Sequence, residues 1–371
     1  MRKTPRRTRE VETVEDLRRL VAAGATSMAG WQLQDLDLRG HGDLLRRLEA
    51  RGALVLGGRL DAEVEADLRS RGALVFPSVP DVPFDAYRSR LYTPEELYDG
   101  LPAGHYADTF DARVYAWSRH TGHDLHALLA QSLHDVAVDD ALEEWLRGRR
   151  VVGVMGGHAL ARGSGGYADA ARLGRSLARA GLTVATGGGP GAMEAANLGA
   201  YLSGRDEGVL DEAIDLLAKV PSYEHSVAAW ARSAVDVRRR WPGGADSLGV
   251  PTWFYGHEPP NALANTVAKY FKNAIREDIL LHVCRGGVVY LPGLGGTVQE
   301  VFQDACENYY AAADDVAPMV LVGRAYWTER MPAWPLLRAL AEGRTMAGHV
   351  HLVDRLDEAT ALLASPDRLD G

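Results

Sequence analysis

Short apolar runs alternate with amphipathic segments along the second part of the chain, from residue 149 onward. The valine-rich runs predict strands buried on both faces of a sheet, at 151–155, 182–186, 250–255, 287–291, 318–322 and 351–353. Helical periodicity predicts helices near 167–180, 191–202, 261–283, 297–311, 333–342 and 356–364. This alternation predicts an α/β fold, a Rossmann-like parallel sheet with helices on both faces. We therefore assign residues 149–371 to one domain.

Residues 203–247 interrupt the alternation. Their periodicity predicts two extra helices, 208–219 and 222–240, before the sequence WPGG. We expect this segment to be a helical insertion beside the sheet.

Residues 1–148 form the predicted N-terminal domain, a smaller α/β unit whose role the sequence does not indicate. Two apolar runs, 52–58 and 72–78, flank a helical run, so this part is either a small β-α-β piece or a local duplication of RGALV. A strongly helical segment follows at 123–149. Its spacing favours helix surface and caps over a metal site for His126, His134, Asp135 and Asp140.

Composition narrows the class of protein. The chain has 371 residues, enough for two domains, and is 46% hydrophobic and 25% charged, as in globular proteins. A net charge of −9 argues against a broad nucleic-acid surface. Cys284 and Cys306 give no disulfide framework or metal spacing, which fits a reducing, cytoplasmic setting. No apolar run approaches membrane-spanning length, so we expect no membrane partner.

The sequence LPGLGGTVQE at 291–300 joins a predicted strand to a predicted helix. A glycine-rich turn in this position leaves backbone N–H groups free at the helix N-terminus, where phosphate is the usual occupant. Glu300 lies one turn into the helix, within reach of a sugar attached to that phosphate. Thr297 and Glu300 also fit S/T-x-x-E, a capping box in which both side chains only satisfy backbone donors.

A second cluster, LTVATGGGPGAMEAAN at 182–197, repeats the order of strand, glycines and helix. Two such turns in one domain favour phosphate binding over capping. The carboxyl ends of parallel strands meet at one edge of a sheet. We therefore expect the turns after four strands to converge, at 155–166, 187–193, 255–261 and 292–297.

The pair GGGPGAMEAAN and PGLGGTVQE resembles the motifs GGGxxGxM and PGGxGTxxE of the LOG family, often mislabelled lysine decarboxylase. The resemblance covers roughly residues 150–365. It implies hydrolysis of a nucleoside 5′-monophosphate to free base and ribose 5-phosphate, with no cofactor and no metal. It also implies a homodimer or a higher even-numbered oligomer. Leu294 departs from the motif, since it replaces the second glycine of PGG.

The resemblance implies a set of site residues. Glu300 would stabilise the oxocarbenium-like state, and Arg276, on the helix before the PGLGGT strand, would help to position phosphate or ribose. Lys272 is the second choice for the basic residue. The implied phosphate- and nucleotide-binding residues are Gly156, Gly157, Gly188, Gly189, Gly191, Met193, Glu194, Gly293, Gly295, Gly296 and Thr297. His158, Ser164, His257 and Glu258 are further candidates, although polar residues in such loops often have no catalytic role.

The predicted helix 261–283 carries Asn265, Lys269, Lys272 and Arg276 at helical spacing. Without the resemblance, this polar face would be interpreted as a solvated helix surface. Asn261 is interpreted as the helix N-cap.

The sequence bears on three other functions. A dinucleotide site is disfavoured, because GGGPGA follows the second strand of the domain and no strand with a terminal acid follows about twenty residues on. Pyridoxal chemistry is disfavoured, because none of Lys219, Lys269 and Lys272 lies at a predicted strand end. The main alternative is a non-catalytic protein that binds or carries a mononucleotide or a phosphorylated cofactor through the same loops.

Overall fold

The computed structural model describes residues 9–101, 104–122, 124–254 and 258–364. The chain forms two compact units, one from Met1–Arg90 with Trp117–Leu142 and one from Leu91–Ala116 with Glu143–Gly371. The α/β fold class is confirmed, since both units contain a parallel sheet with helices. Our predicted boundary at residue 148 differs from this division, because residues 91–116 pack with the second unit. Within the described residues, no helix is both long and apolar enough to cross a membrane.

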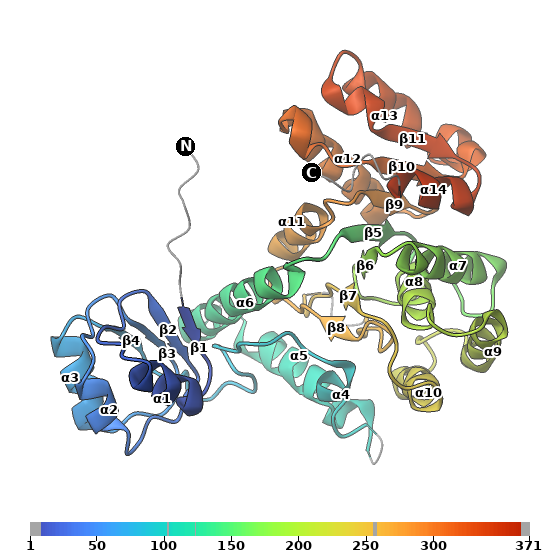
Figure 1. The fold of residues 1–371 in the computed structure, drawn as a ribbon. Helices are drawn as coiled ribbons and strands as arrows, with labels where there is room; N and C mark the ends of the chain where they lie inside the picture. Colours follow the sequence, from blue (N-terminus) through green and yellow to red (C-terminus); the bar gives the residue numbers. More distant parts are fainter. Residues whose placement is uncertain (1–8, 102–103, 123, 255–257, 365–371) are drawn as a thin grey trace. The chain divides into compact units, whose positions relative to one another are not determined.

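The second unit is built on a seven-stranded sheet in the order β11-β10-β9-β5-β6-β7-β8 (Figure 1). Every neighbouring pair is parallel. The strands are β5 Val151–Met155, β6 Thr183–Thr186, β7 Ser247–Gly249, β8 Thr266–Val267, β9 Val288–Tyr290, β10 Met319–Val322 and β11 Val350–Val353. β5 lies between β6 and β9, so the strand order reverses at β5. In open parallel sheets this is where a ligand cleft forms.

Helices connect these strands close to the predicted positions, except that α11 begins later than predicted. They are α7 Gly165–Arg179, α8 Ala192–Tyr201, α11 Asn273–Val283, α12 Gly295–Tyr310, α13 Ala333–Ala341 and α14 Leu356–Leu363. α7 and α8 approach each other closely, and a Cβ at Gly174 or Gly199 would clash with the backbone of the other helix. Val152 and Val154 of β5, Val184 of β6 and Val289 of β9 are buried with α7 and α8 in one core.

The predicted insertion is present as two helices, α9 Glu207–Ala218 and α10 Val227–Arg240. Leu210, Trp230 and Val237 are buried in the same core as α7 and α8. The insertion is therefore part of the packed unit and not a loose appendage.

The predicted helix 261–283 is wrong in its first half. The chain pairs as β8 at Thr266–Val267, and α11 begins only at Asn273. Of the predicted apolar stripe, Leu263, Val267 and Phe271 are buried, whereas its fourth member, Ile275, is 39% exposed. A spacing of four residues fits both a helix and the two-residue period of a strand, so this pattern could not distinguish them. The predicted strand at 250–255 is also wrong, because β7 lies earlier, at Ser247–Gly249.

The polar face predicted for that helix does not exist. Lys269 is 1% exposed, and its Nζ lies 2.6 Å from Asp111 Oδ1, which also accepts a hydrogen bond from Trp253 Nε1 at 2.8 Å. Burial lowers the pKa of Lys269. Asp111 belongs to α5 Phe110–Thr121, which follows α4 Pro94–Leu97. This ion pair connects α5 to the rest of the second unit.

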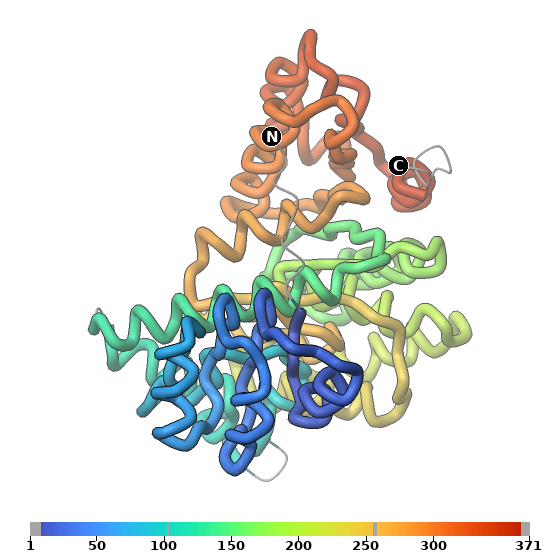
Figure 2. The backbone as a smooth tube through the Cα atoms, turned by 60° about the vertical axis from the view of Figure 1, so that its left-hand side comes forward, coloured from blue at the N-terminus to red at the C-terminus, as the bar shows by residue number. Residues whose placement is uncertain are grey.

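The first unit contains a four-stranded parallel sheet in sequence order. Its strands are β1 Arg9–Val11, β2 Trp31–Gln34, β3 Leu54–Leu56 and β4 Leu74–Phe76; its helices include α1 Val14–Ala22, α2 Gly42–Arg46, α3 Ala62–Ser70 and part of α6 Leu125–Leu146. Gly30 N–H donates to Gly52 O and Gly52 N–H donates to Gly72 O, so equivalent positions of successive turns stack. Figure 2 shows these successive turns in blue. The RGALV duplication is thus part of a longer repeat.

The expectation for His134 and Asp135 as helix surface is wrong. Both are buried in α6, with His134 Nδ1 3.1 Å from Asp135 Oδ1, whereas His126 is exposed. Burial lowers the pKa of His134.

Candidate functional site

A cleft of about 730 Å³ lies at the carboxyl ends of β5, β6 and β9. The predicted convergence of four turns is confirmed, because residues after β5, β6, β7 and β9 all line it. The lining residues are Gly156, Gly157, His158, Ala159, Leu160, Gly187, Gly189, Met193, Pro251, Thr252, Glu258, Arg276, Glu277, Pro292, Gly293, Leu294, Gly295, Gly296, Thr297, Gln299, Glu300, Tyr326 and Arg330. The candidate His257 lies outside the described residues.

The turn after β9 presents the N-terminus of α12 to the cleft. Val298 N–H donates to Leu294 O at 2.9 Å and begins the helical hydrogen bonds. The N–H groups of Gly295, Gly296 and Thr297 therefore have no acceptor within the helix and suit an anion.

The capping box is excluded as an account of this turn. α12 begins at Gly295, two residues before Thr297, and its N-cap Leu294 makes no side-chain capping bond. Thr297 is 5% exposed, and a Cβ at Gly293 would clash with its side chain. Gly293 and Thr297 therefore shape the turn by close packing.

Glu300 and Arg276 line the cleft from two neighbouring helices, α12 and α11. Glu300 is partly buried. Burial raises its pKa to about 7, against an opposing effect of the Arg276 guanidinium and with a smaller contribution from Glu277. A carboxyl group with this pKa can exchange protons near neutral pH.

Arg276 is 9% exposed and is held by its neighbours on α11. Its Nη2 donates to Asn273 Oδ1 at 2.8 Å and lies 3.3 Å from Glu277 Oε1. Its Nε is buried without a hydrogen-bond partner. A ligand oxygen would supply one. Lys272, our second choice, stands at the N-cap of α11 and is not among the described residues that line the cleft.

Glu277 and Gln299 are cleft residues that sequence reasoning missed. Gln299 Nε2 donates to Glu277 Oε2, and Asn273 Nδ2 donates to Glu277 Oε1 at 2.7 Å. Glu277 therefore ties α12 to α11 and orients Arg276. The adjacent Arg276–Glu277 pair was the only sequence signal for this arrangement.

In the second glycine-rich turn, Gly189 and Met193 line the cleft, whereas Gly188 and Gly191 shape its backbone. Gly188 has φ +70°, and a Cβ there would lie 2.6 Å from Pro251 Cδ. Gly191 has φ +72°, and its Cβ would clash with Gly157 O. Positive φ and close backbone approach explain why both positions hold glycine.

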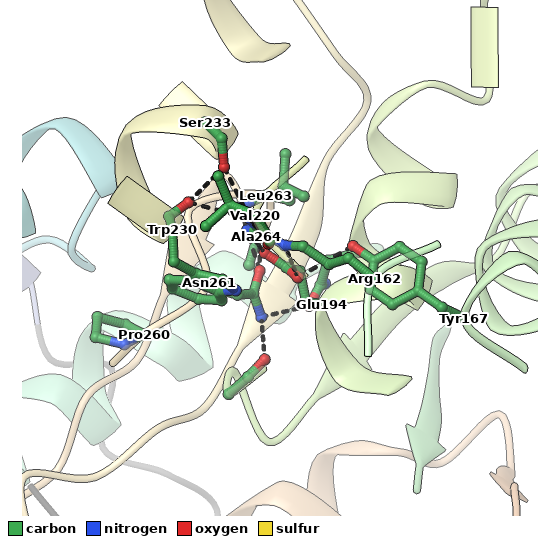
Figure 3. Close-up of polar contacts among 12 residues, drawn as sticks. Arg162, Tyr167, Glu194, Val220, Trp230, Ser233, Pro260, Asn261, Leu263 and Ala264 are labelled. Atoms are coloured by element: carbon green, nitrogen blue, oxygen red, sulfur yellow. Dashed lines mark hydrogen bonds and ion pairs between the residues drawn. The ribbon is translucent and has the colours of Figure 1, made fainter. Parts of the chain in front are cut away.

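Glu194 faces the core and not the cleft, which differs from our prediction that it contacts the nucleotide. Its side chain is fully buried and accepts bonds from Arg162 Nε at 2.8 Å, from Arg162 Nη2 and from the Tyr167 hydroxyl at 3.1 Å (Figure 3). A buried carboxylate requires such partners. Arg162, from the segment between β5 and α7, is likewise buried in this ion pair.

The remaining candidates divide between the cleft and the framework. His158 and Glu258 both line the cleft, with His158 Nδ1 3.8 Å from Glu258 Oε1. Ser164 is the N-cap of α7 and accepts from Tyr167 N–H at 3.3 Å, and it is not among the described lining residues. Asn261 caps no helix. Its Oδ1 accepts from Ala264 N–H at 2.9 Å in a buried turn.

Tyr326 and Arg330 enter the cleft lining from a π-helix, Tyr326–Arg330, after β10. The Tyr326 hydroxyl donates to Gly293 O at 2.5 Å and so holds the α12 turn from outside. Arg330 adds an exposed positive charge on this side of the cleft. No motif in the sequence pointed to either residue.

Comparisons with known proteins identify no family for this chain. No family model matches it, and no curated protein matches it. Solved structures that align with it include the molybdenum cofactor binding protein from the phototrophic bacterium Rippkaea orientalis, at 16% identity and TM-score 0.33 over 58% of this chain and 95% of that chain. Two structures of the molybdenum cofactor carrier protein from Chlamydomonas reinhardtii align at 21% and 20% identity, with TM-scores of 0.36 and 0.35, over 58% of this chain and 99% and 98% of theirs. Likeness at this level carries no argument about ligand or activity, and the LOG resemblance stays a prediction.

Proposed function

We propose that the cleft binds a nucleoside 5′-monophosphate and hydrolyses its N-glycosidic bond, releasing free base and ribose 5-phosphate. The observation that carries this proposal is the position of Glu300 and Arg276 in the same cleft as the free amides of α12. The N–H groups of Gly295, Gly296 and Thr297 would hold the 5′-phosphate. The sugar would then extend toward Glu300 and the Arg276 guanidinium.

Glu300 would have two roles in the reaction. Its carboxylate opposes the positive charge that develops on the sugar as the C1′–N bond breaks, and the bonding electron pair leaves with the base. Water oxygen forms the new bond to C1′. One water proton passes to Glu300 and then to the base nitrogen, which balances the reaction. A pKa of about 7 suits a group that accepts and returns a proton at neutral pH.

The second candidate is a non-catalytic carrier of a mononucleotide or phosphorylated cofactor. The solved structures above are too distant to bear on this choice, and the favouring observation comes from this chain. Leu294 is 64% exposed and lines the cleft beside the free amides of α12. An apolar side chain here suits a cargo that carries an apolar surface next to its phosphate. The proposal of hydrolysis is preferred because a carrier has no need of Glu300 beside Arg276.

The direct test is incubation of the protein with a panel of purine and pyrimidine monophosphates, without added metal, with chromatographic detection of base and ribose 5-phosphate. Nucleosides that lack the phosphate should react much more slowly, because phosphate binding positions the sugar. Binding of several monophosphates without turnover would favour the carrier. Absence of both binding and turnover would exclude both candidates.

We also propose that the chain forms a homodimer or a higher even-numbered oligomer, as the resemblance implies. Apolar side chains are exposed on the helices that border the cleft, with Ile275 of α11 39% exposed and Tyr310 of α12 84% exposed. Light scattering at micromolar concentration measures the mass directly. A monomer mass would contradict this assembly.

A further inference from the structure

The guanidinium of Arg162 joins two separate parts of the second unit (Figure 3). On one side it forms the ion pair with Glu194 in the first turn of α8. On the other side its Nη1 donates to Ser233 Oγ at 2.8 Å, Trp230 O at 3.2 Å and Val220 O at 3.3 Å. These three acceptors belong to the insertion that contains α9 and α10. A single side chain therefore connects the insertion to α8.

The Arg162–Glu194 ion pair at the centre of this connection is buried. Arg162 is 3% exposed and Glu194 is 0% exposed, and the guanidinium lies 4.6 Å from the centre of the Trp230 ring. The planar fork of arginine matches the two carboxylate oxygens, and the donors left over reach the insertion. A lysine could supply the positive charge, but it could not donate hydrogen bonds in all of these directions.

The segment that carries Arg162 also forms one wall of the cleft. Gly156 to Leu160 line the cleft, and the Arg162 N–H donates to Pro221 O at 3.1 Å. Gly163 has φ +80°, and a Cβ there would lie 2.6 Å from Ala218 Cβ. The turn after β5 thus packs between the insertion and the first turn of α8.

The glycine-rich turn between β6 and α8 anchors the next wall of the cleft. Asn261 N–H donates to Gly188 O at 2.8 Å, and its Nδ2 donates to Gly189 O at 3.0 Å. Asn261 follows Glu258, which lines the cleft opposite His158 at 3.8 Å. The walls that contain His158, Met193 and Glu258 therefore share one buried framework.

We propose that Arg162 and Glu194 are positioning residues, through which the helical insertion sets the place of the cleft wall formed by residues 156–160. This inference rests on the proposed function only in taking the cleft as a nucleotide site. Neither residue is among the described residues that line the cleft. Their effect is on how well the wall is ordered before the ligand arrives, and hence on affinity.

The test is the double variant Arg162→Met/Glu194→Gln. It removes both charges together and avoids an unpaired buried charge, while Gln keeps an acceptor for the Tyr167 hydroxyl. We expect a melting temperature close to that of the parent. We expect amide hydrogen exchange in residues 156–161 to be faster by about tenfold or more, and the Kd for AMP to rise by about tenfold. KM should rise with it, and kcat should change less.

The matched control is Arg240→Met/Glu212→Gln. This pair has the same residue types and joins α9 to α10, but it is exposed. It should leave exchange in residues 156–161 and the Kd for AMP unchanged. A double variant at Arg162 and Glu194 that folds and matches this control would overturn the proposal.

Arg162→Lys covers the case in which the double variant does not fold. It keeps a positive charge beside Glu194 but cannot make the Nη1 bonds to the insertion. Faster exchange in residues 156–161 of this folded variant supports the proposal, and unchanged exchange refutes it. If the parent binds none of the purine and pyrimidine monophosphates, the proposed function fails, and the exchange measurement still decides the positioning role.

Discussion

The two glycine-rich turns of the second unit look alike in sequence, yet their acidic residues have opposite positions in the structure. Glu194, after the turn that follows β6, is buried in the core with Arg162 and Tyr167. Glu300, after the turn that follows β9, lines the cleft, where burial raises its pKa to about 7. The two carboxylates differ in the charged and hydrogen-bonding side chains around them. An arginine fork satisfies Glu194, whereas Arg276 is shared with Asn273 and Glu277 and only partly compensates Glu300.

This comparison distinguishes a carboxylate that stabilises the fold from one that can take part in catalysis. A carboxylate with a complete set of donors contributes to folding and order. A carboxylate left in a cleft without a complete set can take up and release a proton. Substitutions at the two positions should therefore change different measured quantities.

The largest expected effect is on folding, from Glu194→Gln alone. This variant leaves the buried Arg162 charge without its counter-ion, which should cost about 3–5 kcal/mol in the free energy of unfolding. Urea denaturation followed by circular dichroism measures it. Adding Arg162→Met should restore most of the lost stability. If Glu194→Gln alone unfolds within about 1 kcal/mol of the parent, the structural role of Glu194 is contradicted.

The next effect is on turnover, from Arg276→Ala. Loss of this guanidinium should lower kcat/KM for a monophosphate by about a hundredfold, the size expected for one charged group at the reacting sugar. It should also raise the pKa of Glu300 further, because Arg276 lowers it in the parent. Steady-state kinetics of the variant check both. Lys272→Ala is the control, since Lys272 stands at the α11 N-cap, and an equal loss there would contradict the role of Arg276.

Activity and stability should depend on pH in opposite directions through Glu300. Turnover needs the carboxylate, so kcat should rise as pH increases through about 7. The folded-state pKa is raised above the unfolded value, so the folded protein retains a proton that the unfolded chain releases. Stability should therefore fall as pH rises from about 4.5 to about 7.

Measurements of kcat and of urea denaturation across the same pH series test both pH dependences. Burial raises the pKa of Asp304 to about 7 as well, so Asp304 contributes to the stability slope but not to the kinetic one. Glu300→Gln should reduce the stability slope without abolishing it. A kcat that falls across this range would contradict the proposed ionisation state of Glu300.

The smallest expected effect comes from Leu294→Gly, which restores the motif's glycine. Leu294 is 64% exposed, so stability should change by less than about 0.5–1 kcal/mol. If the cleft is a nucleosidase site, kcat/KM should stay within about threefold of the parent. Isothermal titration with AMP tests whether the protein is instead a carrier. A loss of affinity beyond about tenfold would instead support a carrier that uses this apolar side chain.

The sequence predicted the parts of the fold that depend on local patterns. Valine-rich runs located β5, β6, β9, β10 and β11, and glycines marked the turns that meet at the cleft. It failed between Asn261 and Lys272, where four-residue spacing fits helix and strand equally. The three-residue strand β1, Arg9–Val11, has too little apolar character to be recognised alone.

The candidate site was predictable where the residues follow a strand directly. Glu300, His158 and Glu258 were expected after predicted strands, Arg276 was expected only from the resemblance, and all four line the cleft. Glu194 was misjudged because its partner Arg162 is brought to it only by the tertiary fold, 32 residues away. Tyr326 reaches Gly293 in the same way, across 33 residues.

The most direct test of this account is the rate of base release from a nucleoside monophosphate by the parent and by Glu300→Gln under single-turnover conditions. Gln keeps the shape of the side chain but removes its negative charge and its proton exchange. The account predicts folding and ligand binding close to the parent, with a rate lower by about a hundredfold or more. Equal rates for the two proteins, or no base release by the parent, would contradict it.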